Sequence, residues 1–407
     1  MNKLMVGNPI AERITYRQLR ANEKILKEIG KVLGEIGELT PSQAYTIGQQ
    51  LKYGDSLQRI VKILSDTSKI NEREIYRMFD LEAQNNLAFS KKYYLAKDID
   101  FIPYNENISL QNKVDEIARA TLGTYRDIAR ATGLTYYDMY GNKVSKPIMV
   151  AYNELVDEAI MNISQGKGTF YQELERQLKE IGKNGVQSIE YATGRKRRID
   201  SALSMNINDG LNKLSMAQQE IMGEQFGYDG VEITVHEFPA DDHAEVQGHI
   251  FKKEEFINLQ NDGIATDING RVIDIHRTLV NGDATNDFRP IGELNCYHRT
   301  FSIVLGVDEP RYSQKELDQI IEKNNKGVEY NGKHYTMYEA TQVQRKLETE
   351  IRKSREQELM LSNPNLESAL MEQKADTKAL LEEYHKFSKI SGLPTQLERT
   401  RLLTSKK

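Results

Sequence analysis

Apolar residues recur at intervals of three and four positions along most of the chain. Near the start this spacing is shared by Ile10, Ile14, Leu19, Ile25, Leu26, Ile29 and Leu33. Such a pattern predicts an amphipathic helix, because 3.6 residues per turn bring these positions to one face. Gly34 is predicted to interrupt this helix. Thr40–Pro41 and Asn71 have the capping chemistry expected at new helix starts.

The same periodicity predicts helices in the middle and at the end of the chain. They cover about residues 111–131, 146–165, 169–181, 201–226, 338–361 and 366–390. Ser313–Glu316 has the sequence of a capping box and predicts one more helix after it. The polar faces of the last two helices carry charges of both signs, which favours packing or oligomer contacts over membrane binding.

The pattern changes at Gly230. Val231–His236 alternates and is rich in β-branched residues, which predicts a strand. Further strands are expected within Gly263–Asp274 and Phe301–Leu305. The chain is therefore predicted to be mainly α with a small α+β domain. The expected regions are an elongated helical N-terminal region at 1–110, a helical middle region at 111–228, a compact mixed domain at 229–312 and C-terminal helices at 313–407.

Composition adds limits to this picture. The 407 residues are 39% hydrophobic and 28% charged and include no Trp, which favours long solvated helices over one dense core. A formal net charge of -5 argues against a general nucleic-acid binder. No apolar run reaches the roughly 18 residues of a membrane span, and the polar N-terminus does not resemble a secretion signal. We expect a chain that folds in a cytoplasm and binds no membrane.

Side chains that can bind a metal are concentrated in two short segments. Residues 241–251 contain His243 and His249, and residues 292–298 contain His298 and Cys296, the one cysteine of the chain. A single cysteine excludes an internal disulfide, which favours a reducing compartment. The four side chains suit Zn²⁺ chemically. However, the spacing within each segment matches no common zinc pattern.

We interpret the two segments as a structural polar cluster of Asp242, His243, Gln247, Asn295, Cys296 and His298. In this interpretation, polar contacts hold two loops of the mixed domain together. No residue is catalytic, and no metal or other cofactor is needed. Zinc held by His243, His249, Cys296 and His298 is the alternative.

Two other chemistries are possible for this region and are less favoured. Cys296 beside a histidine and an aspartate could act as a nucleophile, but no helix N-terminus is predicted to lower its pKa. The aspartates between residues 241 and 287 could bind Mg²⁺ or Ca²⁺. Gly and Asn separate most of them, as in solvated turns.

The strongest basic segment is Arg195, Lys196, Arg197 and Arg198. It could contact DNA phosphates or an acidic partner, or it could be an ordinary solvated loop before the helix at 201–226. Without interleaved aromatic residues, sequence-specific DNA recognition is not expected. Non-specific contact with DNA remains a hypothesis for these four residues.

Several motifs in a fixed order point to a family. They are Asp229–Ile233, Ala240–His243, Gln247–Gly248, Asn295–Cys296 with His298, Gly332–Thr336 and Tyr338–Gln342. In these motifs the chain resembles the minor capsid protein family of tailed phages that infect Gram-positive bacteria. The resemblance is strongest from about residue 190 to residue 360.

The resemblance implies a head-morphogenesis protein that is incorporated in few copies near the portal. Its expected partners are the portal protein and the major capsid protein, with non-specific contact to packaged DNA. Its expected location is the virion, after assembly in the host cytoplasm. The family has no established catalytic residues, so the resemblance assigns none to this chain.

The competing class is an enzyme, namely a metal-dependent nuclease or a toxin-like effector carried in the virion. Such an enzyme would require Asp242, His243, Cys296 and His298 to converge on an open cleft. Stoichiometric zinc in the purified protein would favour this class.

Overall fold

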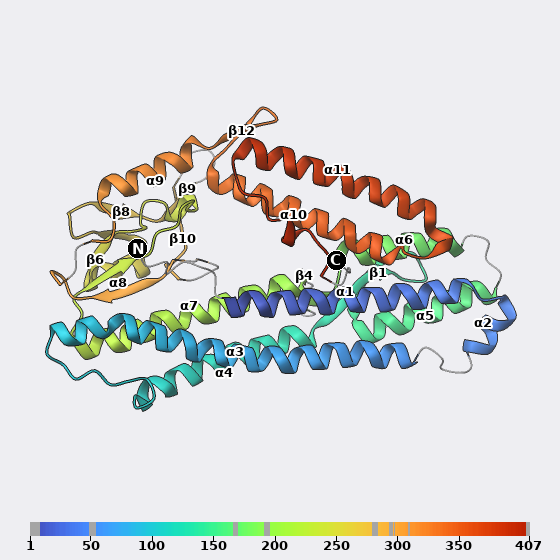
Figure 1. The fold of residues 1–407 in the computed structure, drawn as a ribbon, viewed down its shortest axis with the longest axis horizontal. Helices are drawn as coiled ribbons and strands as arrows, with labels where there is room; N and C mark the ends of the chain where they lie inside the picture. Colours follow the sequence, from blue (N-terminus) through green and yellow to red (C-terminus); the bar gives the residue numbers. More distant parts are fainter. Residues whose placement is uncertain are drawn as a thin grey trace. The chain divides into compact units, whose positions relative to one another are not determined.

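The chain folds into two compact units, each assembled from separate parts of the sequence. The computed structural model describes residues 9–48, 54–165, 170–190, 196–278, 284–292, 296, 298–307 and 310–403. Unit 1 takes Met1–Glu74, Thr124–Ser204 and Val343–Lys407, and unit 2 takes Ile75–Gly123 and Met205–Gln342. Figure 1 shows the course of the chain through the elements of both units.

Helices make up most of the described residues. Four pass from one unit to the other along the chain: α3 (Gly54–Ala96), α4 (Ile108–Arg130), α7 (Ile199–Phe226) and α10 (Met337–Met360). Unit 1 also contains α1 (Pro9–Gly37), α2 (Pro41–Gly48), α5 (Ile148–Ser164), α6 (Phe170–Asn184) and α11 (Glu367–Ser391). Unit 2 also contains α8 (Lys253–Asp262) and α9 (Gln314–Lys326). None of the described helices combines the length and apolar character needed to cross a membrane.

The predicted fold class, mainly α with a small α+β part, is confirmed. The unit boundaries, however, do not follow the four consecutive regions expected from the sequence. They lie near residues 74, 123, 204 and 342, and each falls inside a helix that continues across it. No loop or change in composition marks these positions, because the division depends on contacts between distant segments.

The helix α1 follows the predicted apolar pattern but runs through Gly34 to Gly37. Its stripe is buried, with Ile14 and Ile25 fully inaccessible. The predicted helix start at Asn71 is wrong, because this residue lies inside α3. The Asn71 side-chain oxygen accepts a 2.8 Å hydrogen bond from Nη1 of Arg17. A residue that looks like a cap in the sequence is therefore a buried polar contact between two helices of unit 1.

Unit 1 contains a four-stranded antiparallel sheet that the sequence did not indicate. Its strands are β1 (Thr132–Tyr137), β2 (Lys143–Pro147), β3 (Gln187–Ile189) and β4 (Lys196–Arg198), in the order β2-β1-β3-β4. The helices α5 and α6 pack against β1, where Leu134 and Tyr136 are fully buried. These strands are short, and β1 pairs with β3 more than 50 positions away, so no local periodicity reveals the sheet.

The helices α10 and α11 form an antiparallel pair in unit 1 (Figure 1). Polar contacts hold them together along their length. Ser354 Oγ lies 2.8 Å from Thr377 Oγ1, and Gln344 Nε2 donates to Ser388 Oγ at 3.0 Å. The two helices predicted at about 338–361 and 366–390 are therefore confirmed.

A buried ion cluster connects the sheet of unit 1 to α10. The Arg198 guanidinium donates two hydrogen bonds to the Glu356 carboxylate, at 2.7 and 2.8 Å, and Nε donates to Asp200 at 3.3 Å. The Glu356 side chain is 1% exposed and that of Arg198 is 9% exposed. Burial opposes the charge on Arg198, but the two carboxylates outweigh it and raise the pKa of the guanidinium. Burial raises the pKa of the Glu356 carboxyl, and the charge of Arg198 opposes that shift.

The mixed part of unit 2 is built on a three-stranded antiparallel sheet. Its strands are β11 (Thr300–Ile303), β5 (Gly230–Ile233) and β6 (Ile250–Lys252), with β5 in the centre. Two-stranded pairs are formed by β7 (Ile264–Thr266) with β8 (Val272–Asp274), β9 (His276–Thr278) with β10 (Ala284–Phe288), and β12 (Val328–Tyr330) with β13 (Lys333–Tyr335). The strands predicted after Gly230, within 263–274 and at 301–305 are thus present.

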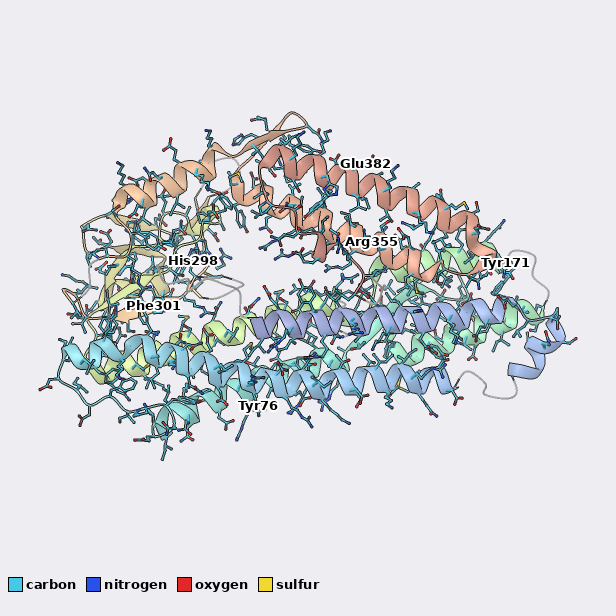
Figure 2. All side chains as sticks on the ribbon, in the orientation of Figure 1. Tyr76, Tyr171, His298, Phe301, Arg355 and Glu382 are labelled. Atoms are coloured by element: carbon cyan, nitrogen blue, oxygen red, sulfur yellow. The ribbon has the colours of Figure 1, made fainter. Side chains whose placement is uncertain are left out.

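Helices α3 and α7 pack against this sheet in unit 2. The Phe301 ring on β11 lies 4.7 Å from the ring of Phe89 on α3, centroid to centroid. The Ser302 N–H donates to Oε1 of Gln219 on α7 at 3.2 Å. Figure 2 shows Phe301 and His298 in this part of the chain. The predicted capping box is confirmed at the N-terminus of α9, where Ser313 and Glu316 exchange hydrogen bonds.

Replacing Glu356 by Gln should lower the free energy of unfolding by about 3 kcal/mol, because Arg198 would remain charged and buried and would be left with the weaker 3.3 Å contact to Asp200. Urea unfolding followed by circular dichroism measures the change. The matched control is Glu382→Gln, which removes a carboxylate paired with Lys378 where both side chains are more than 70% exposed, at 71% and 79%. The control should change the stability by less than about 1 kcal/mol. Equal effects of both substitutions would contradict the assigned role of the ion cluster.

Candidate functional site

Three of the predicted site residues meet in the interior of unit 2. His243 ends the short 3-10 helix η1 (Asp241–His243), while Cys296 and His298 precede β11. The Cys296 Sγ lies 3.3 Å from His243 Nδ1 and 3.5 Å from His298 Nδ1. The exposed fractions of His243, Cys296 and His298 are 0%, 2% and 4%. We refer to these three residues as the His–Cys–His cluster.

His243 is oriented by contacts with Arg289. The Nε2 atom of His243 lies 2.7 Å from the Arg289 carbonyl oxygen. The Arg289 guanidinium donates to the Asp242 carboxylate at 2.8 Å and lies 3.5 Å from His243 Nδ1. Asp242 therefore contributes indirectly, by fixing the arginine that contacts the histidine.

The segment that carries Cys296 and His298 is fixed to its neighbours by backbone contacts. Asn212 on α7 donates to the Cys296 carbonyl at 2.6 Å. Two hydrogen bonds join residues 234 and 299: Thr234 N–H donates to the Arg299 carbonyl at 2.9 Å, and Arg299 N–H donates to Thr234 Oγ1 at 2.8 Å. These contacts hold the backbone at Cys296 and Arg299 in place, independently of the side-chain contacts that Cys296 and His298 make.

Gln247 links His298 to a further histidine. Its Oε1 accepts a hydrogen bond from the His236 backbone N–H at 2.8 Å and lies 3.5 Å from His298 Nε2. The rings of His236 and His298 pack edge to face, with their centroids 4.4 Å apart. The sequence did not single out His236, because it stands in the predicted strand and outside both motif segments. Asn295, the remaining residue of the predicted cluster, lies outside the described residues.

Burial sets the charge state of the cluster. It raises the pKa of the Cys296 thiol, and nearby hydrogen bonds and Arg289 only partly oppose this. It lowers the pKa of His298 well below the usual value, and His236, His243 and Arg289 add to the effect. The thiol is therefore protonated and His298 is neutral near neutral pH. This is the opposite of an activated cysteine nucleophile, which needs a lowered pKa.

His249, the fourth candidate zinc ligand, lies apart from the cluster. Its Nδ1 is 2.8 Å from Oδ2 of Asp267, and both side chains are almost fully buried. Asp267 Oδ1 also accepts hydrogen bonds from the backbone N–H groups of Asn269 and Arg271, at 2.9 and 2.8 Å. In the sequence Asp267 is one of several turn acids. The sequence signal for this contact was the turn at Asp267–Gly270. The side chain of an aspartate in a turn often accepts hydrogen bonds from backbone N–H groups two or more residues later.

Three other described acids of this region are engaged in pairs. Asp242 pairs with Arg289, Glu245 with Arg271, and Asp274 with His276. In these pairs the carboxylates face cationic or imidazole groups. This supports the interpretation of the acidic region as turns rather than as a site for Mg²⁺ or Ca²⁺.

The basic segment divides between the interior and the surface of unit 1. Arg198 is buried against Glu356, so its guanidinium is not presented to solvent. Lys196 is exposed and Arg197 is half-buried, both on the edge strand β4. Arg195 lies outside the described residues. Of the four predicted contact residues, Lys196 and Arg197 are the described ones with accessible side chains.

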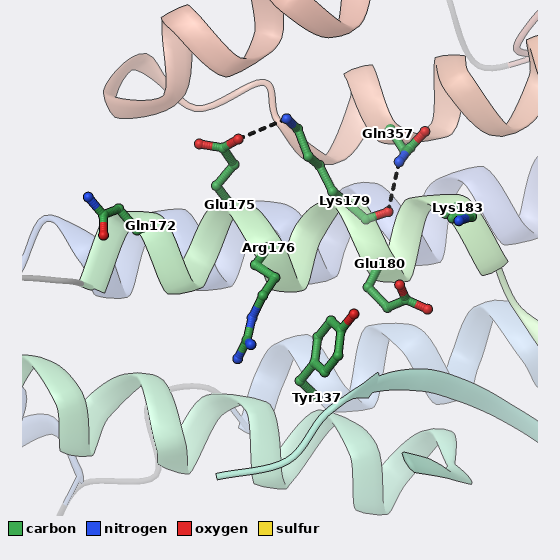
Figure 3. A pocket seen from close by; sticks show the side chains of 8 residues that line it. All are labelled: Tyr137, Gln172, Glu175, Arg176, Lys179, Glu180, Lys183 and Gln357. Carbon is green, nitrogen blue, oxygen red and sulfur yellow. Dashed lines mark hydrogen bonds and ion pairs between the residues drawn. The ribbon is translucent and has the colours of Figure 1, made fainter. Parts of the chain in front are cut away.

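The pocket drawn in Figure 3 lies in unit 1 and has a volume of about 530 Å³. Its lining is mainly charged, and part of that charge is paired. Lys179 contacts Glu175 at 2.8 Å and Glu372 at 3.1 Å, and the Lys179 carbonyl accepts from Gln357 at 3.0 Å. The Arg176 guanidinium lies over the Tyr137 ring. These contacts are typical of a solvated groove between packed elements.

Replacing Asp267 by Asn should lower the stability by about 1.5–3 kcal/mol, since the hydrogen bonds that it accepts are made to a charged group. Burial raises the pKa of Asp267, but the Arg271 and Asn269 N–H groups and His249 outweigh it and lower the pKa overall. The stabilisation is therefore complete above the pKa of an unfolded aspartate, about 3.9, and is lost as the pH falls through the folded pKa. Thermal unfolding at pH 7 and at lower pH measures both effects. A difference between the two proteins that stays constant down to strongly acidic pH would contradict this assignment.

The comparisons with known proteins identify a family for the chain. The chain matches the family described as Phage minor capsid protein 2 over residues 15–387, which include parts of both units. No curated protein and no solved structure matches the chain significantly. The family match covers most of the sequence, and the resemblance inferred from the motifs is confirmed. The chain therefore belongs to the phage minor capsid protein 2 family and is a structural protein of the phage head.

Proposed function

We propose that this head protein acts in capsid assembly near the portal and binds the portal protein and the major capsid protein. The observation that carries the proposal is the family match over residues 15–387. A minor head protein must bury part of its surface against other head subunits in order to be retained. Assembly near the portal is the role that brings it into contact with both expected partners and with the entering DNA.

Exposed apolar side chains near the connection between α3 and α4 support a protein-binding surface in unit 2. Leu95 at the end of α3 is 66% exposed and Ile108 at the start of α4 is 70% exposed. Ile99 and Ile102, between the two helices, are 36% and 46% exposed. Several large apolar side chains exposed in one short segment are typical of an interaction site. We refer to Leu95, Ile99, Ile102 and Ile108 as the α3–α4 apolar segment and assign it to contact with the portal protein.

The geometry of the His–Cys–His cluster supports a structural role over catalysis. The competing enzyme would need Asp242, His243, Cys296 and His298 on an open cleft, and His243, Cys296 and His298 are each less than 5% exposed. A substrate has no access to atoms buried in this way. Turnover of nucleic acid by the purified chain, lost in a folded His298→Ala variant, would instead favour the enzyme.

Non-specific contact with packaged DNA is proposed for Lys196 and Arg197. Both stand on β4, at the edge of the unit 1 sheet. Arg198 is excluded from this contact by its pairing with Glu356. Two accessible cations can bind phosphates without reading sequence, which is the type of contact that a chain of net charge -5 can make locally.

Replacing Leu95 and Ile108 together by Asp should reduce incorporation into heads at least about tenfold, because burial of each side chain is worth about 1.5–3 kcal/mol and each 1.4 kcal/mol is a factor of ten. Quantitative immunoblotting of purified particles measures the incorporation. Tyr140→Asp is the matched control, since Tyr140 is 80% exposed on a turn of unit 1. Normal incorporation of the double variant would remove the α3–α4 apolar segment from the proposal.

Replacing Lys196 and Arg197 together by Glu should weaken binding of the purified chain to double-stranded DNA and lower the infectivity of particles. The plot of log K against log salt concentration should become shallower by about two, one unit for each lost phosphate contact. Filter binding over a salt series measures the slope. The control carries the same charge change at Lys378 and Lys389 on α11, which are both exposed. Equal slopes for the β4 variant and the wild type, with unchanged infectivity, would contradict the DNA contact.

A further inference from the structure

The proposed assembly role makes no use of the chemistry of the His–Cys–His cluster. We propose that His243, Cys296 and His298 bind one Zn²⁺ ion as a structural site inside unit 2. Such a site would stabilise the fold of unit 2 whether or not the chain contacts the portal. The proposal is carried by the protons that the surrounding groups fix on the two imidazoles and by the distances among the three ligand atoms.

The outer nitrogens of both histidines face oxygen acceptors. A carbonyl oxygen can only accept, so the 2.7 Å contact with the Arg289 carbonyl requires a proton on His243 Nε2. Gln247 Oε1 accepts from the His236 N–H, so the His298 Nε2 that faces the same oxygen is also the protonated nitrogen. In neutral imidazoles this leaves a lone pair on each Nδ1. Both Nδ1 atoms point to the same sulfur atom.

The Cys296 thiol and the Arg289 guanidinium are donors that face these lone pairs. The Cys296 thiol has one proton and can donate it to one of the two Nδ1 atoms. Arg289 Nη2 is a further donor to His243 Nδ1, but at 3.5 Å it lies at the limit of a hydrogen bond. A divalent cation at the centre would accept both nitrogen lone pairs and the thiolate together. The thiol proton would leave to solvent as the metal–sulfur bond forms.

The two sulfur–nitrogen distances fit a tetrahedral zinc site. With Zn–S of about 2.3 Å and Zn–N of about 2.0–2.1 Å, tetrahedral angles place sulfur and nitrogen about 3.5–3.6 Å apart. The observed separations of Cys296 Sγ from the two Nδ1 atoms are 3.3 and 3.5 Å. The potential ligand atoms of all three residues lie within 4.8 Å of one another. Thiolate and imidazole together favour Zn²⁺ over Mg²⁺ or Ca²⁺, which prefer oxygen ligands.

The surroundings also resemble the outer shell of known metal sites. Histidine ligands in proteins usually donate their second N–H to a carbonyl, a carboxylate or a water molecule, which fixes the ring and the tautomer. The Arg289 carbonyl and the Gln247 side chain occupy these positions here. The described residues supply three ligand atoms, so a water molecule would complete the tetrahedron. Because the three residues are buried, this water is shielded from substrates and the site is structural.

The physical benefit of the metal follows from the length of chain that it would close. The ion would join η1 to the segment before β11, since His243 and Cys296 are 53 positions apart. Closing a loop of this size restricts the unfolded chain in the way that a disulfide does. The chain has a single cysteine and cannot form an internal disulfide.

The full-length chain, purified without chelators under reducing conditions and supplied with one equivalent of Zn²⁺, should retain about one zinc per chain after desalting. Inductively coupled plasma mass spectrometry measures the metal. Cys296→Ser and His298→Gln should each retain about a tenth of this amount or less. His334→Gln is the matched control, because His334 is on the surface, with its side chain 48% exposed, and it should retain the full amount.

Cobalt substitution of the wild-type chain tests the ligand set directly, and two variants of Gln247 then test its surroundings. Wild-type chain loaded with Co²⁺ should show the visible bands of a tetrahedral ion and a near-ultraviolet band from thiolate-to-cobalt charge transfer. Gln247→Met removes the oxygen that faces His298 and should weaken cobalt binding about 10–100-fold. Gln247→Glu retains an acceptor oxygen and should restore most of the affinity.

Three results would overturn the zinc proposal. Less than about a tenth of a zinc per wild-type chain, or a cobalt spectrum without the thiolate band, would overturn the proposal in favour of a metal-free hydrogen-bonded cluster. Full zinc retention in folded Cys296→Ser and His298→Gln variants would place the ion elsewhere and would also overturn it. Failure of the portal contact would leave these readouts unchanged, so the two proposals can be tested separately.

Discussion

Buried polar side chains that need partners constrain both units of this protein. In unit 1, Glu356 lies almost fully buried and takes both of its strong contacts from Arg198. In unit 2, His243 is inaccessible and His249 is nearly so, and each is held by a group from another element. Leaving such a group without a partner costs more than a well-formed pair contributes, so each pair fixes the relative position of two segments. The positions of the short strands depend on these contacts.

The need of buried polar groups for partners also limits the chemistry of the His–Cys–His cluster. Histidine and cysteine side chains in a cleft would suggest catalysis, but here they are enclosed and their partners hold them in one arrangement. Burial keeps the thiol protonated and His298 neutral, which disfavours nucleophilic attack. A closed cluster of nitrogen and sulfur atoms is suited to holding two segments together. Zinc, if bound there, would strengthen the same link and would not by itself indicate an enzyme.

Head proteins act through their surfaces, and the two units offer different ones. Unit 2 exposes apolar side chains where α3 ends and α4 begins, among them Leu95 and Ile108. Unit 1 exposes Lys196 on an edge strand and keeps the neighbouring Arg198 inside. The family match includes parts of both units. In the proposed role, the exposed apolar side chains of unit 2 would meet other head subunits and the exposed cation of unit 1 would meet DNA.

The sequence alone determined the features that depend on neighbouring residues. The apolar spacing from Ile10 to Leu33, the capping box at Ser313 and the alternation after Gly230 each report a local backbone state, and each agrees with the structure. The ordered motifs identified the family for the same reason, since they are read residue by residue. They also brought His243, Cys296 and His298 forward as candidates.

Tertiary structure decided what depends on residues far apart in the chain. Strand β1 pairs with β3 more than 50 positions away, a separation that no periodicity spans. Asn71 is a buried contact because Arg17 reaches it from another helix. The same holds for Arg198, whose partner is 158 positions away, and for His249, which pairs with Asp267 and not with the other histidines. The physical reason is that burial and the choice of partner are set by packing, which a linear pattern of residue types does not contain.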